Sequence, residues 1–132
     1  MEKIITAFAT DDGENFIDRH FGDAEFYNVY EISSTGVRLL KKIGNSTEED
    51  DDEDGHGDPN KAKGVTGMLK KEGVNVTVSR VFGPNLKRIK KKFLCIIVKE
   101  GNIEESIKKL QERFSDLVDE WSKGEERNFI RL

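Results

Sequence analysis

Short apolar runs alternate with polar segments along the chain and predict five β-strands. Residues 3–9 and 94–98 are apolar almost throughout, as in central strands that are covered on both faces. Residues 25–32 and 74–79 are rich in β-branched and aromatic side chains. Residues 37–43 contain adjacent lysines, which are typical of an exposed edge strand. Three strands therefore come first, and two follow later in the chain.

Helical patterns separate and follow the last two strands. A helix is expected over residues 58–72, because Asp58-Pro59 is a typical start and Gly73 a typical end. A short helix should run from Gly83 to about residue 92. The last helix is expected to begin at Asn102, which forms a capping box with the acid three residues later, and apolar positions keep helical spacing from 103 to 121.

The resulting order, β-β-β-α-β-α-β-α, predicts an α/β fold with one mixed five-stranded sheet and helices on both faces, because crossover helices require parallel strands. We expect a single domain over residues 1–124, with an acidic loop at 45–58. The tail, residues 125–132, has no clear pattern. Sheets of this kind hold ligands at the carboxyl ends of their parallel strands.

The net charge and the number of cysteines limit the kinds of function that this chain can have. The net charge is -4, but seven consecutive acids occupy residues 48–54, and without them the chain would carry about +3. This run lacks the spacing of a calcium loop and indicates a solvated segment. A single cysteine, Cys95, excludes a disulfide within the chain. The absence of a signal peptide pattern and of a long apolar run predicts a soluble cytoplasmic protein.

The two histidines are the strongest chemical lead. His20 lies in a polar segment, residues 10–23, within His20-Phe21-Gly22, and His56 lies within Gly55-His56-Gly57. Imidazole is the commonest metal ligand, and a neighbouring glycine lets a bulky ligand approach the backbone. The alternative is that each is an ordinary loop histidine, with His20 fixing the turn into the second strand.

A set of short motifs resembles the dinitrogenase iron-molybdenum cofactor domain, the domain of NifX-type carriers and of the carboxyl end of NifB. The order and spacing of the motifs carry the resemblance, which covers about residues 3–112. The set comprises residues 10–13, 19–22 and 26–31, Asn45, His56-Gly57, Lys61-Ala62, residues 73–76 and Gly83-Pro84-Asn85.

The resemblance implies a three-layer α/β/α fold of the ribonuclease-H-like type with strand order 3-2-1-4-5. It also implies a non-enzymatic carrier of an anionic metal–sulfur cluster, either an iron-molybdenum cofactor precursor or a molybdenum–copper sulfide. Cluster donor and acceptor proteins would be its partners. His20 and His56 match the family's histidines and would be the metal ligands. The loop around His56 departs from the family pattern because it is acidic.

The remaining cofactor-binding roles follow from this assignment. Phe21 would shield the cluster from water, and Gly22 would allow close backbone approach. Gly83, Pro84 and Asn85 begin a helix and would offer N–H groups to sulfide, although by themselves they fit an ordinary helix start better.

Other chemistries have weaker support. Asp11, Asp12, Asp18 and Asp23 suggest a metal-dependent nuclease, but residues 3–9 contain no acid of the kind that such nucleases hold on the first strand. The basic run at 87–92 lacks exposed aromatic residues and any nucleic-acid motif, so neither nucleic acid nor membrane is an expected partner. The main alternative is a non-catalytic regulatory or protein-interaction module without a cluster. Cys95 is expected to be buried and inert, and the oligomeric state stays open.

Overall fold

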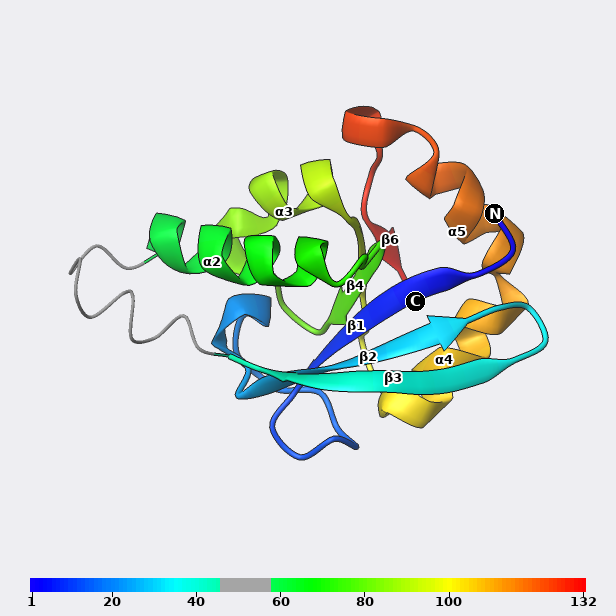
Figure 1. Cartoon of the computed structure of the whole chain (residues 1–132), viewed down its shortest axis with the longest axis horizontal. Coiled ribbons are helices and arrows are strands. Elements are labelled where there is room, and N and C mark those ends of the chain that lie inside the picture. The colour runs from blue at the N-terminus through cyan, green and yellow to red at the C-terminus, as the bar shows by residue number, and fades with distance from the viewer. Residues whose placement is uncertain (46–57) are drawn as a thin grey trace.

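A six-stranded mixed sheet forms the centre of the molecule (Figure 1). The computed structural model describes residues 1–45 and 58–132, with side chains from residue 64 onward in the second part. The strand order is β3-β2-β1-β4-β5-β6. β2 is antiparallel to both β1 and β3, whereas the pairs β1–β4, β4–β5 and β5–β6 are parallel. The strands are β1 Ile4–Thr10, β2 Phe26–Ile32, β3 Val37–Gly44, β4 Val76–Ser79, β5 Leu94–Ile97 and β6 Ile130–Arg131.

Helices cover both faces of the sheet (Figure 1). On one face, α2 and α3 pack on a core that includes Leu69, Ile89 and Tyr27. On the other face, α4 and α5 pack on a second core that includes Phe8 and Leu110. The helices are α2 Asp58–Lys71, α3 Leu86–Lys92, α4 Ile103–Glu112 and α5 Phe114–Trp121, and three short 3-10 turns are η1 Phe21–Asp23, η2 Gly83–Asn85 and η3 Gly124–Glu126.

The sequence-based fold assignment is confirmed in class, layers and the order of its first five strands. β1 is buried along almost its whole length, as an apolar central strand should be. The expected count of five strands is wrong, because Ile130 pairs with Ile96 and Arg131 with Ile97 to add β6. A two-residue strand is too short to leave a pattern in the sequence. None of the described helices has the length and apolar character needed to cross a membrane.

The single long helix expected over residues 103–121 is also wrong, because the chain leaves helical geometry at Arg113. There φ is −108° and ψ is 22°, and α5 begins at the next residue. The apolar face continues across the break from Leu110 to Phe114 and Leu117, all of which join the same core. Hydrophobic spacing alone therefore could not show that the helix is interrupted. The capping box of Asn102 and Glu105 is present as expected.

Arg127 links the C-terminal segment to the ends of helices α3 and α5 through hydrogen bonds. Its side chain is 95% buried, and Nη1 donates to the carbonyl oxygens of Lys90 and Lys91 at 2.9 Å, at the end of α3. Nε and Nη2 lie 3.4 and 3.3 Å from the carbonyl oxygen of Trp121, the last residue of α5. The guanidinium also lies 4.4 Å from the centre of the Trp121 ring. A cation thus satisfies carbonyls that helix ends leave unpaired.

We expect Arg127→Lys to lower the free energy of unfolding by about 2 kcal/mol, because an ammonium group cannot reach both helix ends as the guanidinium fork does. Urea unfolding followed by circular dichroism measures the change. Arg88→Lys, on the exposed side of α3, is the control and should be nearly neutral. Equal unfolding curves for the two variants would contradict the anchoring role of Arg127.

Candidate functional site

The His20 turn lies at the carboxyl edge of the parallel part of the sheet, where ligands of such folds bind. His20 forms a parallel β-bridge with Val81, two residues beyond the end of β4. The backbone N–H of Phe21 donates to the carbonyl oxygen of Val81 at 2.8 Å. The bridge brings the loop after β1 beside the loop after β4, so the predicted His20 and Gly83 segments meet.

The imidazole of His20 packs directly on Gly83. A Cβ atom at residue 83 would lie 2.6 Å from Nδ1 of His20 and 2.7 Å from both Cγ and Cε1. Gly83 also has a φ of +74°, a conformation that side chains disfavour. Both the backbone angle and the close approach therefore require glycine at this position. The contact fixes the plane of the ring without burying it.

The His20 side chain stays accessible after this packing. Its exposed fraction is 51%, and Nδ1 lies 4.0 Å from the carboxylate Oδ2 of Asp23. At this distance the carboxylate lies near the ring without a hydrogen bond to it. An exposed imidazole on a fixed turn is suited to binding a metal centre from solution.

Phe21 and Gly22 occupy different environments. The Phe21 ring is 99% buried, stacks on Phe82 at a centroid distance of 5.2 Å and lies 5.0 Å from Tyr27. It therefore faces the core, where it anchors the turn rather than offering a surface to a ligand. At Gly22, by contrast, the space that a Cβ would occupy has no atom within 4 Å. The backbone at Gly22 is the part of the turn that a bulky group can approach.

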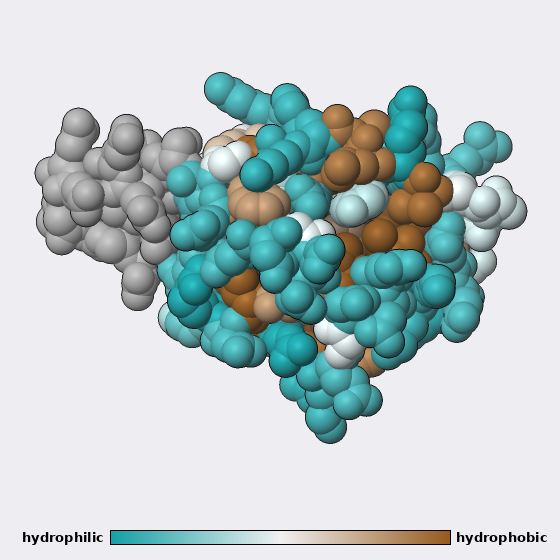
Figure 2. Space-filling view, turned by 90° about the horizontal axis from the view of Figure 1, so that it is seen from below, coloured by the Kyte–Doolittle hydropathy of each residue, from teal (hydrophilic) through white to brown (hydrophobic). Residues whose placement is uncertain are grey.

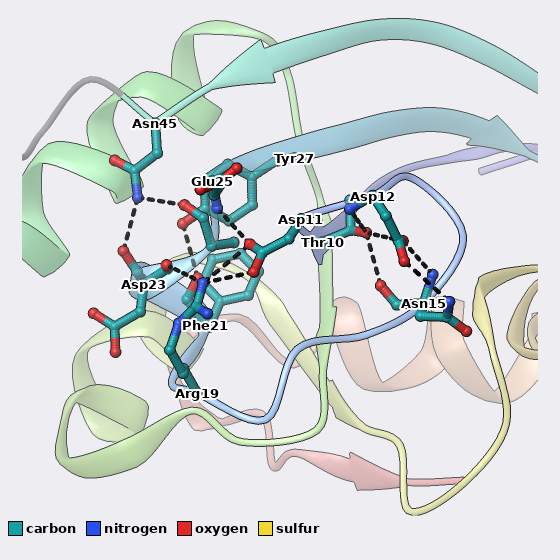
Figure 3. Close-up of polar contacts among 12 residues, drawn as sticks. Thr10, Asp11, Asp12, Asn15, Arg19, Phe21, Asp23, Glu25, Tyr27 and Asn45 are labelled. Atoms are coloured by element: carbon teal, nitrogen blue, oxygen red, sulfur yellow. Dashed lines mark hydrogen bonds and ion pairs between the residues drawn. The ribbon is translucent and has the colours of Figure 1, made fainter.

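Two side chains hold the backbone of this turn (Figure 3). The Tyr27 hydroxyl donates to the carbonyl oxygen of Phe21 at 2.8 Å. The Asn45 amide donates to the carbonyl oxygens of Gly22 and Ala24 at 2.9 and 2.8 Å. Burial, aided by nearby acids, raises the pKa of Tyr27 far above its ordinary value, so the hydroxyl keeps its proton and its donor role.

An ion pair closes the other side of the turn (Figure 3). Arg19 Nη2 lies 2.9–3.0 Å from both oxygens of Asp11 and donates to the carbonyl oxygen of Asp23 at 3.0 Å. Asp11 also accepts from the backbone N–H of Glu25 at 2.9 Å. These positioning roles of Tyr27 and Arg19 leave no signal in the sequence, because contacts across 6 and 8 residues of loop follow no regular period.

Asp12, a second carboxylate of this loop, is engaged in the structure of the loop. Asp12 Oδ1 accepts from the backbone N–H groups of Glu14 and Asn15 at 2.8 Å, and Oδ2 accepts from the Asn15 side chain. These hydrogen bonds, the one from the Asn15 backbone first, lower the pKa of Asp12 to about 2. Such an Asx-type turn explains the acid without a metal ion. Among residues with described side chains, no three His, Cys, Asp or Glu groups converge to hold a metal.

A cation that sequence analysis did not single out lies beside the turn. Arg80 directly follows β4 and precedes Val81, the bridge partner of His20. Its Nε is buried without a hydrogen-bond partner in the described part of the chain. Its Nη1 is 3.7 Å from the exposed Asp18 carboxylate, too far for a strong hydrogen bond. Nothing in the sequence around Ser79 and Arg80 indicates that this arginine lies beside the His20 turn.

Four other predicted residues have separate outcomes. Pro84 and Asn85 lie in η2 beside the His20 ring and remain partly or fully exposed. His56 lies outside the described residues, so the joint role of two imidazoles stays a prediction. Cys95 is fully buried as expected, and burial raises the pKa of its thiol to about 12. It therefore remains protonated and inert at neutral pH.

Comparison with known proteins identifies the family of this arrangement. Residues 2–113 match the family described as Dinitrogenase iron-molybdenum cofactor. The chain belongs to this family. No curated protein matches it. The crystal structure of a provisionally named dinitrogenase from Methanocaldococcus jannaschii is 22% identical and superposes with a TM-score of 0.58, over 85% of this chain and 91% of that one. At this identity the likeness establishes the shared fold of the family domain.

We expect Gly83→Ala to destabilise the family domain more than Gly124→Ala does. Both glycines begin a 3-10 turn with positive φ, +74° and +65°, so both variants should lose about 1 kcal/mol to backbone strain. Only the Gly83 variant adds a clash with His20, because a Cβ at Gly124 meets no atom within 4 Å. Urea unfolding and the NMR shifts of the His20 ring measure this. Equal losses with unmoved ring signals would contradict the packing.

The carboxyl group of Asp12 should titrate near pH 2 in the folded protein. Its pKa is lowered from an ordinary value of 3.8, so its ionised form favours the folded state above pH 3.8, and that contribution is lost as the pH falls through about 2. An NMR titration of the Asp12 carboxyl carbon gives the midpoint. A midpoint near 3.8 would show that the turn is not held as described.

Proposed function

We propose that the chain is a non-catalytic carrier of an anionic metal–sulfur cluster, either an iron-molybdenum cofactor precursor or a molybdenum–copper sulfide. Membership of the dinitrogenase iron-molybdenum cofactor family supports a cofactor-related role. The observation that carries the proposal is the His20 imidazole, which is half-exposed yet held by Gly83 on one side and a braced turn on the other. The cluster is cargo here, taken up and passed on unchanged.

His20 would be the main anchor, binding a metal atom of the cluster through imidazole nitrogen. Gly22 would let the cluster approach the backbone, because open space lies beside it. The Gly83-Pro84-Asn85 turn would provide N–H groups toward sulfide, and His56 would be a second or gating ligand. One or two imidazoles with a few polar contacts give a bond weak enough for transfer, which a carrier requires.

Arg80 adds the charge that an anionic cargo needs. Its side chain is 37% exposed, and its described contact with the Asp18 carboxylate is a loose one of 3.7 Å from Nη1. The arginines at 19 and 127, by comparison, are engaged by carboxylates or carbonyls. Partners would be a cluster donor and a cluster acceptor in the cytoplasm, with no role for nucleic acid or membrane.

The test is uptake of a defined cluster without oxygen. Protein mixed with tetrathiomolybdate and Cu(I), or with an iron–sulfur donor, should retain visible absorbance and stoichiometric metal after gel filtration. His20→Ala should weaken uptake by roughly tenfold or more, since even loss of a group that only orients a ligand has such an effect. Arg88→Ala is the matched control, because Arg88 is an exposed cation on α3.

Two results would count against the proposal. Protein that stays colourless with every donor would favour the alternative of an interaction module without a cluster. The specific feature behind that alternative is the exposed basic face of α3, made by Lys87, Arg88, Lys91 and Lys92. It predicts an acidic partner whose binding weakens as salt rises. Equal uptake by wild type and His20→Ala would retain the carrier but remove His20 as its anchor.

A further inference from the structure

A trough with a mixed polar and apolar lining runs along the face of the sheet that α4 covers only in part. In Figure 1, α4 lies behind β3, and the view from below in Figure 2 shows apolar surface surrounded by polar groups. The trough has a volume of about 520 Å³. Tyr30 of β2 lines it between Val37 and Leu39 of β3 and Ile103 and Ile107 of α4. It is separate from the His20 site.

Hydrogen bonds fix the trough at both ends. At one end, the backbone N–H of Ile103 donates to the carbonyl oxygen of Glu14 at 3.0 Å. At the other end, the Gln111 amide donates to the carbonyl oxygens of Ser33 and Gly36 in the β2–β3 turn, at 3.2 and 3.1 Å. Strand and helix are therefore tied together, and the trough is part of the folded framework.

The walls of the trough expose large apolar side chains. Val37 is 47% exposed and Leu39 is 53% exposed. Together with Leu40 they are three of the five large apolar residues exposed in the described part of the chain, and all three lie on β3. Apolar surface gathered on one strand beside a groove marks an interaction site rather than scattered exposure.

Opposite charges border the two sides of the trough. Glu104 of α4 and Glu14 of the loop after β1 line it. Lys42 stands on the β3 side, with Nζ 4.0 Å from the centre of the Phe26 ring. That ring in turn lies beside Gly13, which lines the same end of the trough as the two acids. The charges are therefore at one end, on opposite sides.

We propose that this trough is a self-association surface, occupied by a second copy of the chain. A two-fold axis parallel to the trough would place the β3 side of each copy over the α4 side of the other. Lys42 of each copy would then face Glu104 of its partner, and the Leu39 side chains would enter the facing troughs. The surface is self-complementary in both charge and apolar side chains. In a two-fold dimer, each of these pairings occurs twice.

Association edge to edge through β3 fits less well. Arg38, Lys41 and Lys42 give the strand three cations in eight residues. In an antiparallel pair of β3 strands, these like charges would lie opposite or near one another, and such pairs are destabilising. The face of the strand is therefore the favoured surface and its edge is protected.

Analytical ultracentrifugation of the full chain over a range of concentrations tests the proposal. Wild type should shift from monomer to dimer, and Leu39→Glu should remain monomeric at every concentration. Leu40→Glu is the matched control, because Leu40 is an exposed apolar residue of the same strand that does not line the trough. It should dimerise as wild type does.

Charge reversal tests the orientation. Lys42→Glu or Glu104→Lys alone should weaken dimerisation by roughly tenfold, because each places like charges together twice in the dimer. The two substitutions combined should restore most of the affinity. A wild type that is monomeric throughout would overturn the proposal, as would loss of the dimer in Leu40→Glu or a double variant no better than the single ones. Cluster uptake does not enter these measurements, so its failure would leave this inference intact.

Discussion

The contact between the loop after β1 and the loop after β4 is the constraint on which the candidate site depends. Phe21 donates its N–H to Val81, and the His20 ring lies on Gly83. Two loops from neighbouring parallel strands thereby become one surface. Burial of Phe21 against Phe82 adds an apolar anchor beneath that surface. Without this junction the imidazole would be a mobile loop side chain, and binding a ligand would cost the entropy of ordering it.

The polar residues around the turn also hold the His20 imidazole in a fixed position. Tyr27, Asn45 and Arg19 donate to backbone carbonyls of the loop, and Arg19 also pairs with Asp11, so this carboxylate helps to position the turn. A rigid loop with one free imidazole, an adjacent guanidinium and an open glycine fits a site that recognises a preformed anionic object.

The sequence was sufficient for the parts of the fold that follow a period. Apolar runs located the first five strands, and Gly73, Gly83 and the capping box at Asn102 marked helix ends. It was insufficient where tertiary contacts decide. The interruption at Arg113 keeps the apolar face continuous, and β6 is a two-residue strand. At the site, motifs identified His20 and Gly83, but the burial of Phe21 and the role of Tyr27 depend on packing between distant segments.

The helices cover the two faces of the sheet unequally, and this relates the His20 turn to the trough between β3 and α4. α2 covers the β3 side of one face, where Lys41 of β3 pairs with Glu72 just beyond the helix at 2.6 Å. On the opposite face, Gln111 ties α4 to the β2–β3 turn and the first residue of the helix is held at Glu14, while the trough lies between the helix and β3. This trough faces away from the core that supports Phe21. Self-association there can therefore leave the His20 turn accessible, so one domain can pair with its copy and still present its imidazole to a cargo.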